Sequence, residues 1–89
     1  MEKLSVMVKV ARALKDPNPL TRTGAAQALN RLGSAGALAS PVLIEALDDS
    51  VPAVRHEAAE ALQKINTPDA QKALRFYPLK ERVRSMLHK

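Results

Sequence analysis

Apolar side chains recur every three or four positions through the middle of this chain, which is the spacing of one helix face. Between residues 54 and 65 this face consists of Val54, Ala58, Ala61, Leu62 and Ile65. The stretch DDSVP, at residues 48–52, precedes it and is rich in residues that favour turns. The pattern predicts an amphipathic helix that begins at this turn and buries one face.

A second copy of the pattern lies 33 residues earlier, which indicates an internal repeat. Eight identities connect residues 14–29 with residues 47–62. They are Leu14/Leu47, Asp16/Asp49, Pro19/Pro52, Arg22/Arg55, Ala25/Ala58, Ala26/Ala59, Ala28/Ala61 and Leu29/Leu62. The first copy follows the turn DPNP, and its expected buried face consists of Thr21, Ala25, Ala28, Leu29 and Leu32.

Each turn is preceded by another amphipathic run, so the chain is expected to fold into helix pairs. The regular pairs cover about residues 2–32 and 35–66, and an irregular C-terminal pair covers about 68–88. Pro41 favours a kinked or delayed start of the first helix in the second pair. Stacked helix pairs predict an all-α fold, a short right-handed α-solenoid of five to six helices in a single domain of residues 1–89.

The C-terminal pair departs from the repeat register. Thr67, Pro68 and Asp69 have the features of a helix start, and this run extends through Leu74. A further amphipathic helix is expected after Pro78. Its apolar face contains Leu79, Val83, Met86 and Leu87, and its other side carries Lys80, Arg84 and His88.

The two repeat segments are LKDPNPLTRTGAAQALNRL at residues 14–32 and LDDSVPAVRHEAAEALQKI at residues 47–65. This pattern resembles the HEAT-like repeats of the phycocyanobilin-lyase (PBS lyase) type over about residues 2–74. The resemblance implies that the turn Asp and the Arg of the second helix form a ladder between stacked repeats. By that resemblance, the structural ladder consists of Asp16, Arg22, Asp49 and Arg55.

The net charge of +5 is concentrated at the C-terminal end of the chain. Residues 72–89 contain six Lys or Arg and one acidic residue, whereas residues 1–71 contain eight of each sign. Such a basic end attracts nucleic acid, an acidic partner or an anionic membrane surface, or it is a solvated helix. A nucleic-acid site would use Lys72, Arg75, Lys80, Arg82 and Arg84, with Phe76 or Tyr77 stacking on a base.

Composition and hydropathy narrow the remaining possibilities. The chain contains no cysteine, which excludes disulfides, thiolate zinc sites and thiol nucleophiles. The N-terminal run places Lys9 and Arg12 inside its apolar stretch, which does not match a signal peptide. No stretch of 18 consecutive apolar residues occurs. We therefore expect a soluble cytoplasmic protein without a membrane partner.

One potential metal motif is the pair His56-Glu57, which is similar to the His-Glu pairs that hold a di-iron centre in deoxyhypusine hydroxylase. The equivalent positions in the first repeat are Thr23 and Gly24, so a single pair remains where several ligands must converge. We expect His56 and Glu60 to form an ordinary surface pair on one helix. Phosphate loops and Ser-centred nucleophile motifs are also absent from the sequence, so we expect neither a cofactor nor enzymatic activity.

The leading functional hypothesis is a non-catalytic scaffold that binds another protein through the outward residues of its second helices. These candidate contact residues are Thr23, Gln27, Asn30, Arg31, His56, Glu60, Gln63 and Lys64. A homodimer through Val6 and Val10 is a further expectation, because these residues widen the apolar arc of the first helix. A chromophore-lyase or maturation role is an alternative that depends only on the resemblance.

Overall fold

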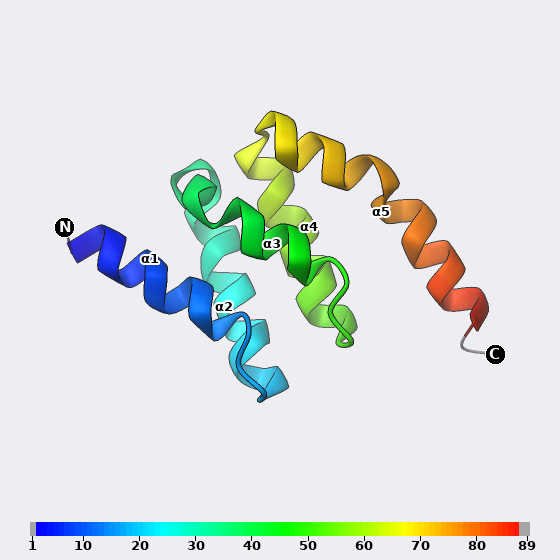
Figure 1. Cartoon of the computed structure of the whole chain (residues 1–89), viewed down its shortest axis with the longest axis horizontal. Helices are drawn as coiled ribbons and strands as arrows, with labels where there is room; N and C mark the ends of the chain where they lie inside the picture. Colours follow the sequence, from blue (N-terminus) through cyan, green and yellow to red (C-terminus); the bar gives the residue numbers. More distant parts are fainter. Residues whose placement is uncertain (1, 88–89) are drawn as a thin grey trace.

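The computed structural model describes residues 2–87, and these residues form five α-helices and one 3-10 helix without a β-strand (Figure 1). His88, expected on the polar side of the last helix, lies outside this range. The elements in chain order are α1 (Glu2–Ala13), α2 (Pro19–Leu32), the 3-10 helix η1 (Gly33–Ala39), α3 (Ser40–Ala46), α4 (Pro52–Ile65) and α5 (Pro68–Leu87). The prediction of a short all-α solenoid is confirmed.

The second helix of each repeat begins and ends where local chemistry dictates. Both α2 and α4 have a proline in their first turn, where the missing N–H is not needed. The Asn18 side chain accepts a hydrogen bond from the Leu20 N–H at 2.9 Å and so caps α2. At the other end, Gly33 follows α2 with φ +57°, and Asn66 follows α4 in the left-handed region.

The delayed helix start predicted near Pro41 is also present. The chain leaves α2 in η1, and the α-helical part of this segment is only α3, with Pro41 in its first turn. Small residues make η1 compact, and Gly36 lies close to the backbone carbonyl of Leu29. Helix η1 packs against both α2 and α4.

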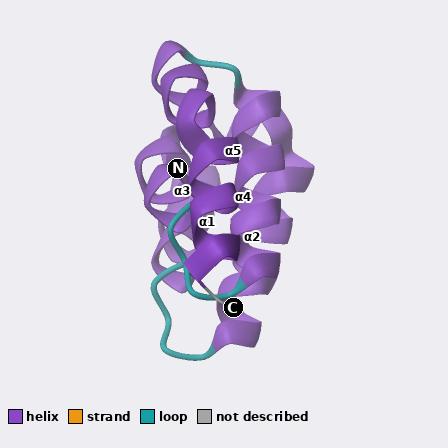
Figure 2. Ribbon diagram, turned by 90° about the vertical axis from the view of Figure 1, so that its right-hand side faces the viewer, coloured by secondary structure: helices purple, strands orange, loops and turns teal. Residues whose placement is uncertain are grey.

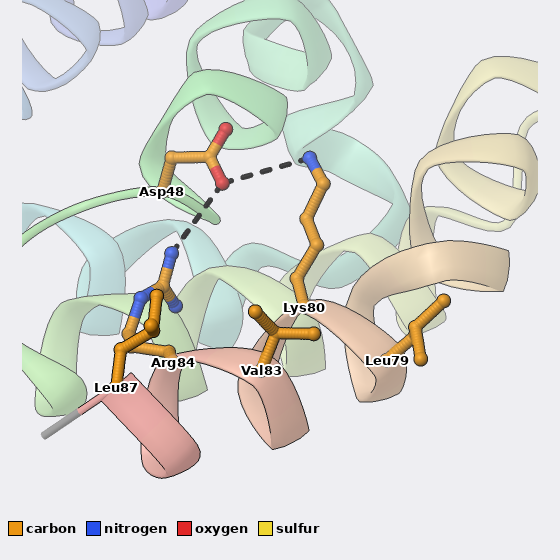
Figure 3. A pocket seen from close by; sticks show the side chains of 6 residues that line it. All are labelled: Asp48, Leu79, Lys80, Val83, Arg84 and Leu87. Carbon is orange, nitrogen blue, oxygen red and sulfur yellow. Dashed lines mark ion pairs between the residues drawn. The ribbon is translucent and has the colours of Figure 1, made fainter. Parts of the chain in front are cut away.

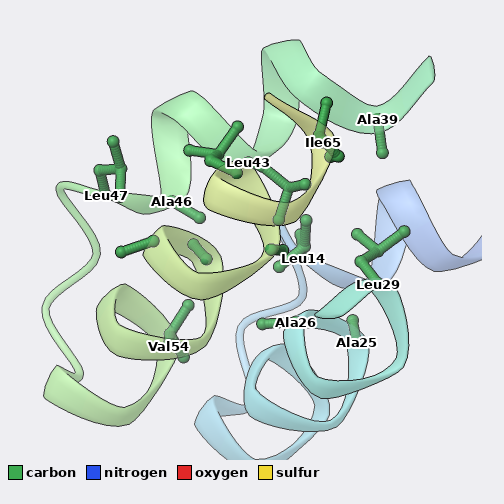
Figure 4. Close-up of a cluster of buried hydrophobic side chains, with 14 of the residues drawn as sticks. Leu14, Ala25, Ala26, Leu29, Ala39, Leu43, Ala46, Leu47, Val54 and Ile65 are labelled. Carbon is green, nitrogen blue, oxygen red and sulfur yellow. The ribbon is translucent and has the colours of Figure 1, made fainter. Parts of the chain in front are cut away.

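The core lies between two layers of helices. Helices α2 and α4 lie side by side in one layer, and α1 and α3 cover them from the other (Figure 2). Small alanines line the contact, so the helices pack closely around a few larger apolar side chains (Figure 4). The largest fully buried side chains are those of Leu29, Leu43, Val54 and Leu62.

The buried face of the first repeat is narrower than the periodicity predicts. Thr21 is exposed and Leu32 is 43% exposed, whereas the equivalent Val54 and Ile65 are 0% and 7% exposed. Helix α4 lies between α2 and α5. Among the described residues, α2 has such a neighbour, α4, on one side only. Equivalent sequence positions therefore differ in burial because their helices differ in the number of neighbours.

The predicted C-terminal helix pair is wrong in one respect, because α5 is a single helix with Pro78 inside it. A proline within a helix removes one backbone hydrogen bond and bends the axis, but it does not always end the helix. Figure 1 shows the ribbon of α5 changing direction partway along its length. The N-terminal part of α5 packs on α4, and the C-terminal part passes the turn between α3 and α4.

Candidate interaction surfaces

An arginine ladder connects the repeats and fixes the surfaces that they present. Arg22 of α2 donates to both carboxylate oxygens of Asp49, from Nε at 2.8 Å and from Nη2 at 3.3 Å. Its Nη1 donates to the backbone carbonyl of Asp16 at 2.8 Å. The Asp16 carboxylate accepts the Asn18 N–H within its own turn. One planar guanidinium thus ties its own turn to the turn of the next repeat.

The next step of the ladder uses a residue that the repeat pattern missed. Arg55 is 6% exposed and donates through Nη1 to the Asp49 carbonyl at 2.8 Å. Its Nε donates to Glu81 Oε1 on α5 at 2.7 Å. The repeat register would place the acceptor at Arg82, which has the wrong charge. The sequence does contain a clue to this role, because Glu81 is the only acidic residue between residues 72 and 89.

Asn30, expected on the outward side of α2, is in fact buried between α2 and α4. Its Nδ2 donates to Glu57 Oε1 at 2.7 Å and to Glu60 Oε2 at 3.2 Å. Its backbone carbonyl accepts from Lys64 Nζ at 3.1 Å. Helical periodicity identifies the polar side of an isolated helix, but here α4 packs directly against the polar side of α2. Asn30 is therefore part of the contact between repeats and is closed to a partner.

Four of the expected contact residues border one open cleft between α4 and α5. The cleft has a volume of about 500 Å³, and Tyr77 and Pro78 form its α5 side. The residues on its α4 side are His56, Ala59, Glu60, Gln63 and Lys64. Thr23, Gln27 and Arg31 lie on α2 and do not line this cleft.

His56 occupies the exposed edge of this cleft as a helix surface pair. Its Nε2 lies 2.7 Å from Glu60 Oε1, one turn further along α4. Within the described part of the chain, no three His, Cys, Asp or Glu side chains gather in a way that would hold a metal ion. The geometry at His56 is that of an i, i+4 pair in water.

Tyr77, one of the two expected base-stacking residues, is partly buried on the side of α5 that faces α4. It packs against the hydrophobic core, whereas its neighbour Phe76 is 53% exposed. Burial raises the pKa of the Tyr77 phenol, the negative charge of Glu81 raises it further, and Arg55 and Arg84 act in the opposite direction. A stacking role is therefore open to Phe76 and not to Tyr77.

The five basic residues of α5 separate into two groups. Lys80 and Arg84 both lie 3.5 Å from Asp48 Oδ1 in the turn before α4, and Arg84 also pairs with Glu81. Lys72, Arg75 and Arg82 are exposed, and no carboxylate pairs with them among the side chains that the structure describes. The residues expected to form one basic site thus face two different sides of the helix.

Between these two groups runs a row of exposed apolar side chains, which we call the outer stripe. It occupies positions that recur at three- and four-residue steps along α5, so it forms one face. Its members are Phe76, Leu79, Val83, Met86 and Leu87. Every one of them is exposed by 47% or more.

A groove of about 530 Å³ lies along one edge of the outer stripe (Figure 3). Leu79, Val83 and Leu87 form its apolar side, and Lys80 and Arg84 extend from α5 to Asp48 on its other side. The groove is therefore apolar on the α5 side and is bordered on the other side by the ion pairs of Lys80 and Arg84 with Asp48. It would accept apolar side chains from a partner.

The N-terminal end differs from the expected dimer surface. Val6 is 55% exposed, but Val10 packs against the core and is only partly accessible. Val8 and Leu38 are exposed close by and border a small hollow of about 180 Å³. The apolar patch around this hollow therefore consists of Val8 and Leu38, because η1 folds against the side of α1 that bears Val8, whereas Val6 lies two residues away on another side of α1.

The described helices are each too short or too polar to cross a lipid bilayer. This finding covers residues 2–87.

Comparison with known proteins identifies the repeat pattern. A family model described as HEAT repeats matches residues 9–85. Neither the curated proteins nor the solved structures include a significant match to the chain.

Proposed function

This chain belongs to the HEAT repeat family, and we propose that it is a protein-interaction module whose binding face is the outer stripe of α5. HEAT repeats generally mediate contacts between proteins, and stacked helix pairs offer extended surfaces for this purpose. The family match is to HEAT repeats as a whole and does not distinguish the phycocyanobilin-lyase type.

The observation that carries this proposal is the concentration of exposed apolar area on one helix. Isolated exposed hydrophobic residues are common, but a continuous row bordered by polar residues is typical of an interaction site. The outer stripe meets this description, since basic residues lie on both of its edges and a groove follows it. Its helix is also held to the body by Arg55 and Glu81, which gives a partner a defined surface.

The cleft between α4 and α5 is a candidate for a second contact, on a different side of α5 from the outer stripe. Tyr77 and Pro78 form its α5 side. Its polar residues His56, Glu60, Gln63 and Lys64 are all candidate contact residues from the sequence. Thr23, Gln27 and Arg31 on α2 would be reached only by a partner that extends across the second-helix layer. We propose the outer stripe as the main, apolar site and this cleft as a separate, polar contact site.

Binding of nucleic acid is a weaker proposal on the same helix. Two of its five candidate residues, Lys80 and Arg84, are already paired with Asp48. The remaining three flank apolar side chains that a phosphate backbone would leave uncovered. Self-association through α1, with the exposed Val6 at the contact, is a separate proposal, and a chromophore-lyase role has only the repeat resemblance in its support.

The test is affinity capture from lysate with the wild-type chain, Val83→Asp and the control Leu20→Asp. Val83 lies in the outer stripe and is 47% exposed, whereas the control Leu20 is an apolar residue on α2 that is 81% exposed. The proposal predicts a discrete protein that survives nuclease and high salt, is retained by Leu20→Asp and is lost from Val83→Asp. Recovery that disappears with nuclease and falls steeply with salt would instead support the nucleic-acid alternative.

A further inference from the structure

The charges around the outer stripe restrict what can cover it. Lys72 precedes the stripe by one turn, and Arg75 and Arg82, seven residues apart, follow one of its edges. On the opposite edge, Lys80 and Arg84 are both paired with Asp48, and Arg84 shares Glu81 with the buried Arg55. The unbalanced charge that a partner meets is therefore positive and lies along a single edge.

The shape of the surface restricts the occupant further. The groove between α5 and the turn at Asp48 is concave, and its apolar side is formed by Leu79, Val83 and Leu87. A flat bilayer surface would contact the crest of the helix and leave this groove empty. Side chains that project from a helix enter such a groove as knobs.

A second copy of this chain is a poor occupant on grounds of charge. Two outer stripes facing each other would bring the rows of Lys72, Arg75 and Arg82 into proximity, and like charges at an interface are repulsive. The apolar patch at the N-terminal end offers no better match, because α1 carries the exposed basic residues Lys9 and Arg12. Single-stranded nucleic acid would satisfy the charge, but only Phe76 offers an exposed ring for a base.

We propose that the outer stripe binds an amphipathic helix of a partner protein, with Leu-type residues facing the stripe and Asp or Glu residues along the edge that meets Arg75 and Arg82. This inference depends on the proposed function, since it names the class of partner for the same face. Phe76 to Leu87 spans about 16 Å at helical rise, so the partner helix needs about three turns. Its apolar residues recur at i, i+3 or i+4, and i+7.

The test is a selection of displayed 16-residue peptides on the folded chain. The enriched sequences are expected to combine helical apolar spacing with an excess of Asp and Glu on one flank. Parallel selections use Val83→Asp, which should lose this enrichment, and Leu20→Asp, which should keep it. Circular dichroism spectra that match wild type show that both variants retain the helical fold.

Charge reversal then isolates the edge of the stripe. The double variant Arg75→Glu and Arg82→Glu should bind the best acidic peptide about tenfold more weakly at low salt, because two exposed ion pairs are lost. The matched control Lys9→Glu and Arg12→Glu makes the same change on α1 and should leave the affinity unchanged. A peptide with Lys in place of its acidic residues should regain affinity for the reversed variant.

The outcomes separate this inference from the function on which it depends. Enrichment of neutral or basic helices that Val83→Asp abolishes would overturn the acidic partner and leave the proposed function intact. Enrichment that ignores the Val83→Asp change, or no enrichment at all, would overturn both. Three further measurements test other occupants: binding to phosphatidylserine vesicles, binding to a single-stranded oligonucleotide, and dimer formation in sedimentation. If Val83→Asp abolishes any of these, another occupant covers the stripe and the inference is wrong.

Discussion

At the scale of single residues, polar side chains between the helices determine how the repeats are joined. Arg22 and Arg55 are equivalent in sequence and make equivalent contacts, each holding its own turn carbonyl and a carboxylate from the next element. Burying a guanidinium is costly unless its donors are satisfied, and here the carbonyl and the carboxylate satisfy them together. The ladder therefore sets the spacing of the helices as well as adding stability.

Asn30 offers a direct test of the contact between α2 and α4. Asn30→Ala removes the hydrogen bonds to Glu57 and Glu60 and should lower the free energy of unfolding by about 1–2 kcal/mol, measured by urea denaturation. The loss is limited because Asn30 Oδ1 is itself buried without a partner among the described residues. Asn30→Asp keeps the shape but faces two carboxylates, so it should cost more. Gln27→Ala, an exposed change on the same helix, should be nearly neutral, and an equal loss there would contradict the assignment.

Tyr77 predicts a dependence of stability on alkaline pH. Its folded-state pKa is raised, mainly by burial and then by Glu81, so the neutral phenol is favoured in the folded chain. This contribution is fully present below the ordinary pKa of tyrosine, about 10, and is lost as pH rises through the folded-state pKa. Because Tyr77 is the only tyrosine, absorbance of the tyrosinate should titrate at a higher pH than in free tyrosine. Tyr77→Phe should lose this part of the alkaline destabilisation, and an unchanged profile would contradict the burial.

At the scale of elements, α5 occupies the position of a third repeat although it does not repeat the sequence. Its Ala70 and Tyr77 face the body, and Glu81 takes the position of the missing turn acid. Pro78 bends the helix between these contacts without interrupting it. The half of α5 after Pro78 carries most of the outer stripe, so its attachment decides whether the candidate site is preformed.

Glu81→Gln tests this attachment. It keeps the shape of the side chain but weakens the charge-assisted hydrogen bonds from Arg55, so amides in residues 79–87 should exchange about tenfold faster in hydrogen exchange. Protection of α2 and α4 should change much less. Glu45→Gln is the matched control, because its partner Lys15 forms an exposed pair that contributes little. Faster exchange throughout the chain would indicate a general loss of stability and not a local one.

At the scale of the whole molecule, the short stack makes burial depend on position within it. The two repeats are nearly equivalent in sequence, yet α4 is covered on more sides than α2. A solenoid gains stability from contacts between neighbouring repeats, so an inner helix contributes more than an end helix. Among the described residues, the exposed large apolar side chains lie on α1, η1, α2 and α5, and α3 and α4 carry none of them.

Two equivalent positions measure this end effect. Ile65→Ala should lower the free energy of unfolding by about 2–4 kcal/mol, the usual range for a buried aliphatic side chain. Leu32→Ala, at the same position in the first repeat, should cost about 1 kcal/mol or less because its side chain remains partly in water. Urea denaturation of the two variants gives the comparison. Similar losses at both positions would show that α2 is covered on its second side, for example by a second copy.

The sequence predicts the repeat, its two turns and the helix starts next to Pro19 and Pro52. These features depend on local chemistry, in which proline, capping side chains and helical spacing act within a few residues. It also determined the apolar face at Leu79 to Leu87, because periodicity reveals which residues share a face. The HEAT-like resemblance followed from the same local pattern.

Tertiary packing fixes what lies against each helix face. It buried Asn30, left Leu32 partly exposed, joined the last two predicted helices through Pro78 and recruited Glu81 as the acceptor for Arg55. Periodicity cannot supply this information, since a polar stripe looks the same whether water or another helix covers it. Burial and pairing arise from contacts between residues about 26 to 34 positions apart, and only the packed arrangement fixes which of them meet.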